Sequence, residues 1–151
     1  MSLPLPRRLA LAAAVVTLAG GLSGCSLLPL GNNTSAFTME VGQCVQVPDG
    51  DRVSRFETTE CTAEHDAEVF HILKLTDSEL PPESDLKEKA GNECADAFEG
   101  YIGTAYEESS LDIYTTYPTK TTWAIGDREV VCMATPLDHS KLTSSVKDSG
   151  M

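Results

Sequence analysis

Five cysteines and their positions constrain the fold of this chain more than any other feature. The first, Cys25, ends the run Leu-Ser-Gly-Cys at 22–25, which follows a pair of arginines and an apolar stretch at 9–18. A basic start, an apolar stretch and small residues before a cleavage point are typical of a secretory signal. A cysteine at that point identifies a bacterial lipobox. We predict a lipoprotein signal peptide at 1–24 and a lipid on Cys25.

An uncleaved transmembrane helix is the alternative, because apolar residues continue through Leu30, far enough to span a bilayer. The glycines at 20, 21 and 24 argue against it. The stretch 25–37 contains Pro29 and a polar run at 31–35 and has neither strand nor helix periodicity, so we interpret it as the lipidated cysteine and a short tether. Cleavage leaves about one domain of chain. We therefore expect an extracytoplasmic protein held on the outer face of the cell membrane.

The remaining cysteines form an even set, which in a small exported domain indicates disulfides. They are Cys44, Cys61, Cys94 and Cys132, and four thiols allow three pairings. No two of them form a C-x-x-C pair, so a zinc site is the weaker interpretation. Each disulfide typically contributes about 2 to 4 kcal/mol, a large share of the stability of a small domain.

Alternating apolar residues and turn signals predict a sheet of about five strands. The run 67–75 is dense in branched and aromatic residues, which favours a central strand, and 129–135 is apolar on both faces, which favours an interior one. Gly126-Asp127 lies between apolar flanks and predicts a β-hairpin turn within 123–128. The expected strands are 41–47, 56–61, 67–75, 113–117 and 129–135.

One long helix is predicted after Pro82, where acids and the hydroxyl of Ser84 mark a helix start. Its apolar residues recur at spacings of three and four, and Gly103 fits the left-handed residue after a helix end. Cys94 lies inside this apolar stripe. The stripe comprises Leu86, Ala90, Cys94, Ala97, Phe98, Tyr101 and Ile102.

These elements predict an α+β fold: a small antiparallel or mixed sheet with one main helix packed on it and two disulfides. A bridge from Cys94 on the helix to Cys132 on a strand is the natural pairing, which leaves Cys44 to pair with Cys61 on neighbouring strands. We expect the domain to span 38–136. The polar segment 137–151 is expected to be a flexible tail, frayed from Ser140 onward.

The composition excludes several classes of function. The formal net charge of −12 at pH 7 disfavours nucleic acid and anionic lipid headgroups, whose binding relies on basic patches. The sequence contains no G-x-S-x-G, no H-E-x-x-H and no glycine-rich phosphate loop. We therefore expect no catalytic residues, no cofactor and no nucleic-acid partner.

Two clusters remain as candidate binding sites. His65, Glu68 and His71 are possible ligand or metal contacts, although an unbent strand places Glu68 on the face opposite both histidines. We favour a structural interpretation, in which His65 caps a turn and Glu68 pairs with a cation such as Arg128.

The second cluster is Trp123, Asp127 and Arg128. A guanidinium over an indole suits a binding platform. A lone tryptophan that covers the edge of a small core is the structural alternative.

The spacing of these residues resembles the septum-formation domain family, found largely in exported or membrane-attached proteins of actinobacteria. The pattern is C…C-x-x-x-H-x-x-E-V…C…P…W-x-x-G-D-R…C, carried here by Cys44, Cys61, His65, Glu68, Val69, Cys94, Pro118, Trp123, Gly126, Asp127, Arg128 and Cys132. The resemblance implies a role in cell division or cell-envelope assembly and brings no catalytic residues.

Our leading expectation is a non-catalytic, lipid-anchored module that binds an envelope protein or a wall component. Its membrane contact is the lipid on Cys25. Capture of a small ligand or metal at the membrane surface is the alternative, and a cell-wall hydrolase is the least favoured.

Overall fold

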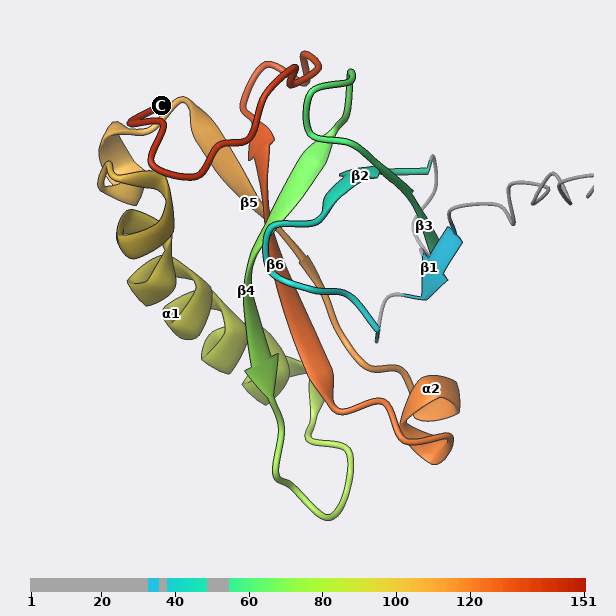
Figure 1. The fold of residues 1–151 in the computed structure, drawn as a ribbon. Coiled ribbons are helices and arrows are strands. Elements are labelled where there is room, and N and C mark those ends of the chain that lie inside the picture. The colour runs from blue at the N-terminus through green and yellow to red at the C-terminus, as the bar shows by residue number, and fades with distance from the viewer. Residues whose placement is uncertain (1–32, 36–37, 49–54) are drawn as a thin grey trace, which may run out of the picture.

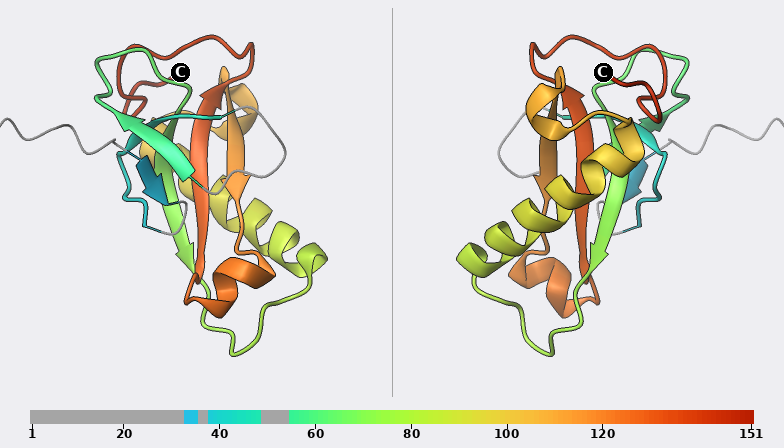
Figure 2. Two further views of the ribbon diagram at one scale, coloured as in Figure 1. Left: turned by 90° about the vertical axis from the view of Figure 1, so that its right-hand side faces the viewer. Right: turned by 90° about the vertical axis from the view of Figure 1, so that its left-hand side faces the viewer.

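The computed structural model describes residues 33–35, 38–48 and 55–151, and it contains one antiparallel sheet with a long helix across one face (Figures 1 and 2). The six strands lie in the order β1-β3-β2-β4-β6-β5. Their bounds are β1 Asn33–Ser35, β2 Cys44–Gln46, β3 Arg55–Thr59, β4 Ala67–Lys74, β5 Leu111–Thr116 and β6 Glu129–Pro136. The helices are α1 Glu83–Ile102, the 3-10 turn η1 Tyr106–Glu108 and α2 Lys120–Ala124. The predicted α+β class is confirmed.

The two strands predicted to be central and interior have those positions. β4 lies between β2 and β6, and β6 lies between β4 and β5. β1 was not predicted: Asn33–Ser35 pairs with residues 55–57 of β3, so this part of the expected tether belongs to the sheet. The signal peptide and Cys25 lie outside the described residues.

Helix α1 forms where its apolar stripe predicts it. Leu86, Ala90, Cys94, Phe98 and Ile102 are its buried residues. The helix begins after Pro82, whose side chain has no acceptor, so no side chain caps the first backbone N–H groups. Ser84 lies within the first turn and donates its hydroxyl to Asp85. It ends at Gly103, whose φ of 87° is the left-handed conformation and whose N–H donates to Glu99 O.

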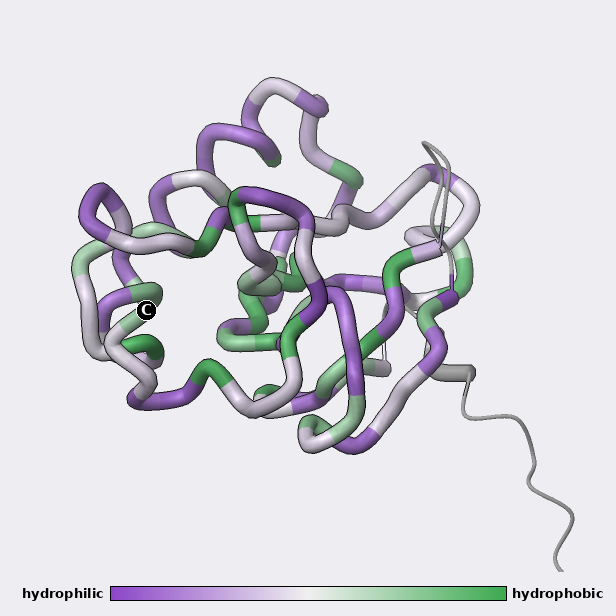
Figure 3. The backbone as a smooth tube through the Cα atoms, turned by 90° about the horizontal axis from the view of Figure 1, so that it is seen from above, coloured by the Kyte–Doolittle hydropathy of each residue, from purple (hydrophilic) through white to green (hydrophobic). Residues whose placement is uncertain are grey.

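A β-bulge in β4 decides which side chains face α1. The register to β6 shifts between Val69 and His71, so that Phe70 and His71 both lie on the helix side. Ala67, Val69 and Ile72 pack in a separate apolar cluster with Phe56 and Met133, away from α1. Figure 3 shows hydrophobic residues recurring through the middle of the molecule and hydrophilic ones on the outer turns.

The hairpin predicted within 123–128 is wrong, since the segment before Gly126 is helical. Thr119 and Thr122 form a capping box, in which each side chain satisfies the backbone N–H of the other, and this starts α2. Gly126, with φ of 102°, then turns the chain toward β6. β5 and β6 are still antiparallel neighbours, but a helical turn joins them.

The flexible tail predicted from residue 137 is also wrong. Leu142 is 5% exposed and Val146 is fully buried, and both belong to the cluster that joins α1 to the sheet. The backbones of Leu142 and His65 exchange two hydrogen bonds, and Lys141 forms an ion pair with Asp66 at 2.6 Å. We call 137–151 the C-terminal segment, and it is part of the folded domain.

Leu142→Ala is expected to lower the free energy of unfolding by about 2 to 5 kcal/mol, because it removes a buried side chain from the main core. Urea unfolding followed by circular dichroism measures the change. Leu137→Ala is the control from the same segment: Leu137 is 57% exposed, so its change should stay below about 0.5 kcal/mol. Equally small effects in both variants would contradict a packed C-terminal segment.

Candidate functional site

A fully buried carboxylate, Glu68, lies at the junction of β4, α1 and the C-terminal segment. Its Oε1 accepts hydrogen bonds from the Tyr101 hydroxyl at 2.7 Å and from Ser145 Oγ at 2.8 Å. Its Oε2 accepts one from the Val146 N–H at 2.7 Å. Three donors therefore compensate the desolvation of one charge. The expected pairing of Glu68 with Arg128 is wrong.

The sequence pattern predicts none of the three donors. Tyr101 lies on the apolar stripe of the helix, and no motif singles out its hydroxyl. Ser145 and Val146 lie in the segment expected to be flexible. The spacing of Leu142 and Val146, two apolar residues four apart in polar chain, was the one available sign that this segment packs.

Tyr101 is the donor that ties the helix to Glu68. Burial, and then the hydrogen bond to the Glu68 carboxylate, raise the pKa of the Tyr101 hydroxyl. The hydroxyl therefore stays protonated as a donor across the physiological range. Gly42 lies close by, since a Cβ built on it would be 3.6 Å from the Tyr101 oxygen.

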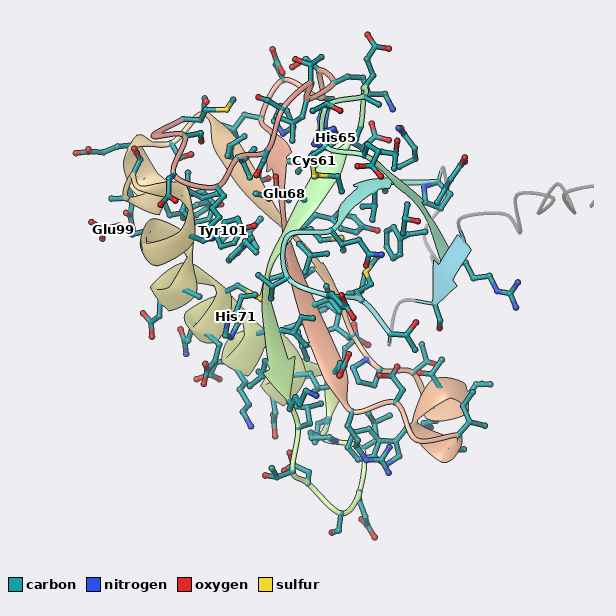
Figure 4. The ribbon with its side chains drawn as sticks, viewed as in Figure 1. Cys61, His65, Glu68, His71, Glu99 and Tyr101 are labelled. Atoms are coloured by element: carbon teal, nitrogen blue, oxygen red, sulfur yellow. A yellow bond between two sulfur atoms is a disulfide. The ribbon has the colours of Figure 1, made fainter. Side chains whose placement is uncertain are left out.

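His65, labelled in Figure 4, lies just before β4 and is fully buried. Its Nδ1 lies 2.8 Å from Ala63 O, and because a carbonyl only accepts, Nδ1 is the nitrogen that donates. This contact fits the turn-capping interpretation. Its Nε2 is buried with no hydrogen-bond partner among the described residues.

His71 does not join His65. The bulge places His71 opposite Cys132, on the helix side of the sheet, so it shares a face with Glu68 rather than with Ala67 and Val69. Within the described part of the chain, three potential metal-ligand groups meet within 4.8 Å at Cys44, Cys61 and Glu68, without either histidine. The two sulfur atoms there are already joined to each other.

Both predicted disulfides are present. Cys44–Cys61 joins β2 to the turn after β3, and Cys94–Cys132 joins α1 to β6, with Cα separations of 5.3 and 5.7 Å. Cys94 and Cys132 are fully buried. Cys44 is 1% exposed, whereas its partner Cys61 is partly exposed.

The second candidate cluster lies at the other end of the molecule, around α2. The Arg128 guanidinium stacks over the Trp123 ring, 3.6 Å from its centroid, and donates to the carbonyl oxygens of Trp123 and Asp127. Asp127 is 5% exposed and accepts from the N–H of Glu129. Trp123 also packs against a small apolar cluster between α1 and β6. Ile125 beside it is 69% exposed.

The fold and its two disulfides define a disulfide-stabilised α+β domain. A family model described as septum formation matches residues 28–132, which is more than half of the chain, and the chain belongs to this family. Comparison with curated proteins and with solved structures gave no match. Among the described residues, no helix is long and apolar enough to cross a membrane. The disulfides and the family are consistent with an extracytoplasmic location.

The raised pKa of Tyr101 predicts a loss of stability at high pH. The pKa of tyrosine in an unfolded chain is about 10, whereas the folded protein retains the Tyr101 proton above that pH. Above about pH 10 the unfolded state binds fewer protons than the folded state, so the free energy of unfolding falls as pH rises. The stabilising contribution of the protonated Tyr101 hydroxyl is fully present below about pH 10.

Tyr101→Phe should therefore flatten this alkaline fall, while it lowers stability at neutral pH through the lost hydrogen bond. Urea unfolding at several values from about pH 8 to 11 measures both effects, because the window brackets the unfolded pKa. A slope equal to that of the unsubstituted protein would contradict the assigned environment of Tyr101.

Proposed function

We propose that this protein is a non-catalytic, lipid-anchored module on the outer face of the cell membrane, which binds an envelope protein during septum formation or cell-envelope assembly. Membership of the septum formation family supports the process. The lipobox at 22–25 supports the anchor, and the two disulfides support the compartment.

One surface feature carries the binding proposal, and we call it the α2 platform: Trp123, Ile125 and Arg128. Ile125 exposes 69% of its surface beside the Trp123–Arg128 stack. Tryptophan and arginine are the residues most enriched among those that dominate binding energy at interfaces. The stack holds both side chains in place before a partner arrives, which reduces the entropy lost on binding.

The position of the platform suits a partner that approaches from outside the domain. Figure 1 shows α2 projecting at the end of the sheet far from the C-terminus. The formal charge of −12 favours a partner with basic residues around an apolar contact. His65 and Glu68 are fully buried, so capture of a small ligand by these two groups has less support than the α2 platform.

A photo-crosslinking amino acid at position 125 is expected to join the protein to one envelope protein in living cells. The same residue at position 88, on the exposed face of α1, is the control and should not give that adduct. Mass spectrometry of the adducts identifies the partner. Identical adducts from both positions, or none from position 125, would contradict the platform.

Ile125→Asp should then weaken capture of that partner at least tenfold, because it places a charge in the apolar contact. The melting temperature should remain unchanged, since Ile125 is exposed. Val41→Asp, which alters another exposed apolar residue, 53% exposed, should affect neither measurement.

Cys25→Ser is expected to abolish incorporation of an alkyne-tagged fatty acid and to release the protein from the membrane fraction, because serine offers no thiol for lipid attachment. Ser23→Ala keeps a small residue in the lipobox and should retain the label. Labelled Cys25→Ser protein would exclude Cys25 as the anchor.

A further inference from the structure

The two disulfides differ in their access to solvent and in what lies beside them. Cys94–Cys132 is sealed between α1 and β6. Cys61, by contrast, is partly exposed and opens on a surface hollow of about 450 Å3 between residues 42–44 and 58–61. Disulfide exchange requires that a thiolate reach one of the sulfur atoms, so Cys61 is the sulfur that can react.

The buried sulfur of this disulfide has a carboxylate next to it. Cys44 is directly opposite Glu68 in the β2–β4 ladder, and a Glu68 oxygen and both sulfur atoms lie within 4.8 Å of one another. Figure 4 shows Glu68 between Cys61 and Tyr101. The donors Tyr101, Ser145 and Val146 fix the carboxylate in this position.

We propose that Cys44–Cys61 is a thiol–disulfide exchange site, with Cys61 as the attacking sulfur, Cys44 as the resolving sulfur and Glu68 as the acceptor of the Cys44 proton. Its substrate class is the disulfide of another exported protein. The proposal is independent of the α2 platform, which lies at the other end of the sheet.

The reaction balances in two steps. The Cys61 thiolate attacks one sulfur of the partner disulfide, which forms a mixed disulfide and releases the first partner thiolate. Cys44 then gives its proton to Glu68 and attacks Cys61 Sγ, which restores Cys44–Cys61 and expels the second partner thiolate. The two partner thiolates take up the two protons that Cys61 and Cys44 gave up, which returns Glu68 to the carboxylate. Two protein thiols are oxidised and one partner disulfide is reduced. A protein dithiol in the same compartment returns the site to its reduced form by the reverse exchange.

The first test is selective reduction of the folded, oxidised protein by dithiothreitol, followed by alkylation and mass spectrometry. Cys44 and Cys61 should become labelled while Cys94 and Cys132 stay unlabelled and the circular dichroism spectrum stays native. Reduction of both disulfides together, or of neither before unfolding, would overturn the proposal.

The second test is the rate at which oxidised dithiothreitol re-forms Cys44–Cys61 in the selectively reduced protein. Glu68→Gln should slow ring closure by about a hundredfold, the usual effect of a positioned proton acceptor. Glu60→Gln changes an exposed acid at the same hollow and should leave the rate within twofold.

Two further variants separate proton transfer from structural support. Leu142→Ala loosens the packing of the C-terminal segment but keeps the Glu68 carboxylate and its donors, so its closure rate should also stay within twofold. If Leu142→Ala slows closure as much as Glu68→Gln, Glu68 acts only in the structure and the proposal fails. If Glu68→Gln does not fold, Glu68→Asp is the alternative variant, because it keeps a carboxylate but places it farther from Cys44. An unchanged closure rate in Glu68→Asp would also overturn the proposal.

Discussion

The structure depends on how it compensates one buried charge. Glu68 has no contact with solvent, and an isolated carboxylate in such a place would cost far more than a domain of this size can offset. Its three hydrogen bonds come from α1 and from the C-terminal segment. If α1 or the C-terminal segment were displaced, the buried carboxylate would lose hydrogen-bond donors. One residue of β4 therefore couples the helix, the sheet and the end of the domain.

The two disulfides add covalent links at two different places in the sheet. Cys94–Cys132 fixes α1 to β6, next to the aromatic contact of Phe98 with Phe70. Cys44–Cys61 holds the β2–β3 side against the region of Glu68. Both links lie on the helix side of the sheet, because Cys44 pairs with Glu68 and Cys94 belongs to α1. The apolar cluster on the opposite face is held by packing alone.

The parts of this fold that follow a regular period could be predicted from sequence. The stripe of α1 has one period and the apolar runs of β4 and β6 are continuous, and the disulfide pairing follows from where these elements place Cys94 and Cys132. The features that interrupt these sequence patterns could not be predicted. The bulge at Phe70 moves His71 to the other face, and the reciprocal threonine contacts of α2 replace a hairpin. The C-terminal segment is held by the hydrogen bond from the Val146 N–H to Glu68. The two residues are distant in sequence, so no local pattern predicts this contact.

The edge of the sheet bears on where a partner can bind. β5 is an outer strand, and outer strands invite pairing with another chain. Here the backbone N–H of Leu111 donates to Ser109 Oγ, and that of Ile113 donates to the Asp112 carboxylate, which also accepts from the Tyr106 hydroxyl. Side chains thus occupy donors that an added strand would need. Pairing with the β5 backbone therefore offers an incoming strand little, whereas the proposed α2 platform relies on side-chain contact and is unaffected by these occupied donors.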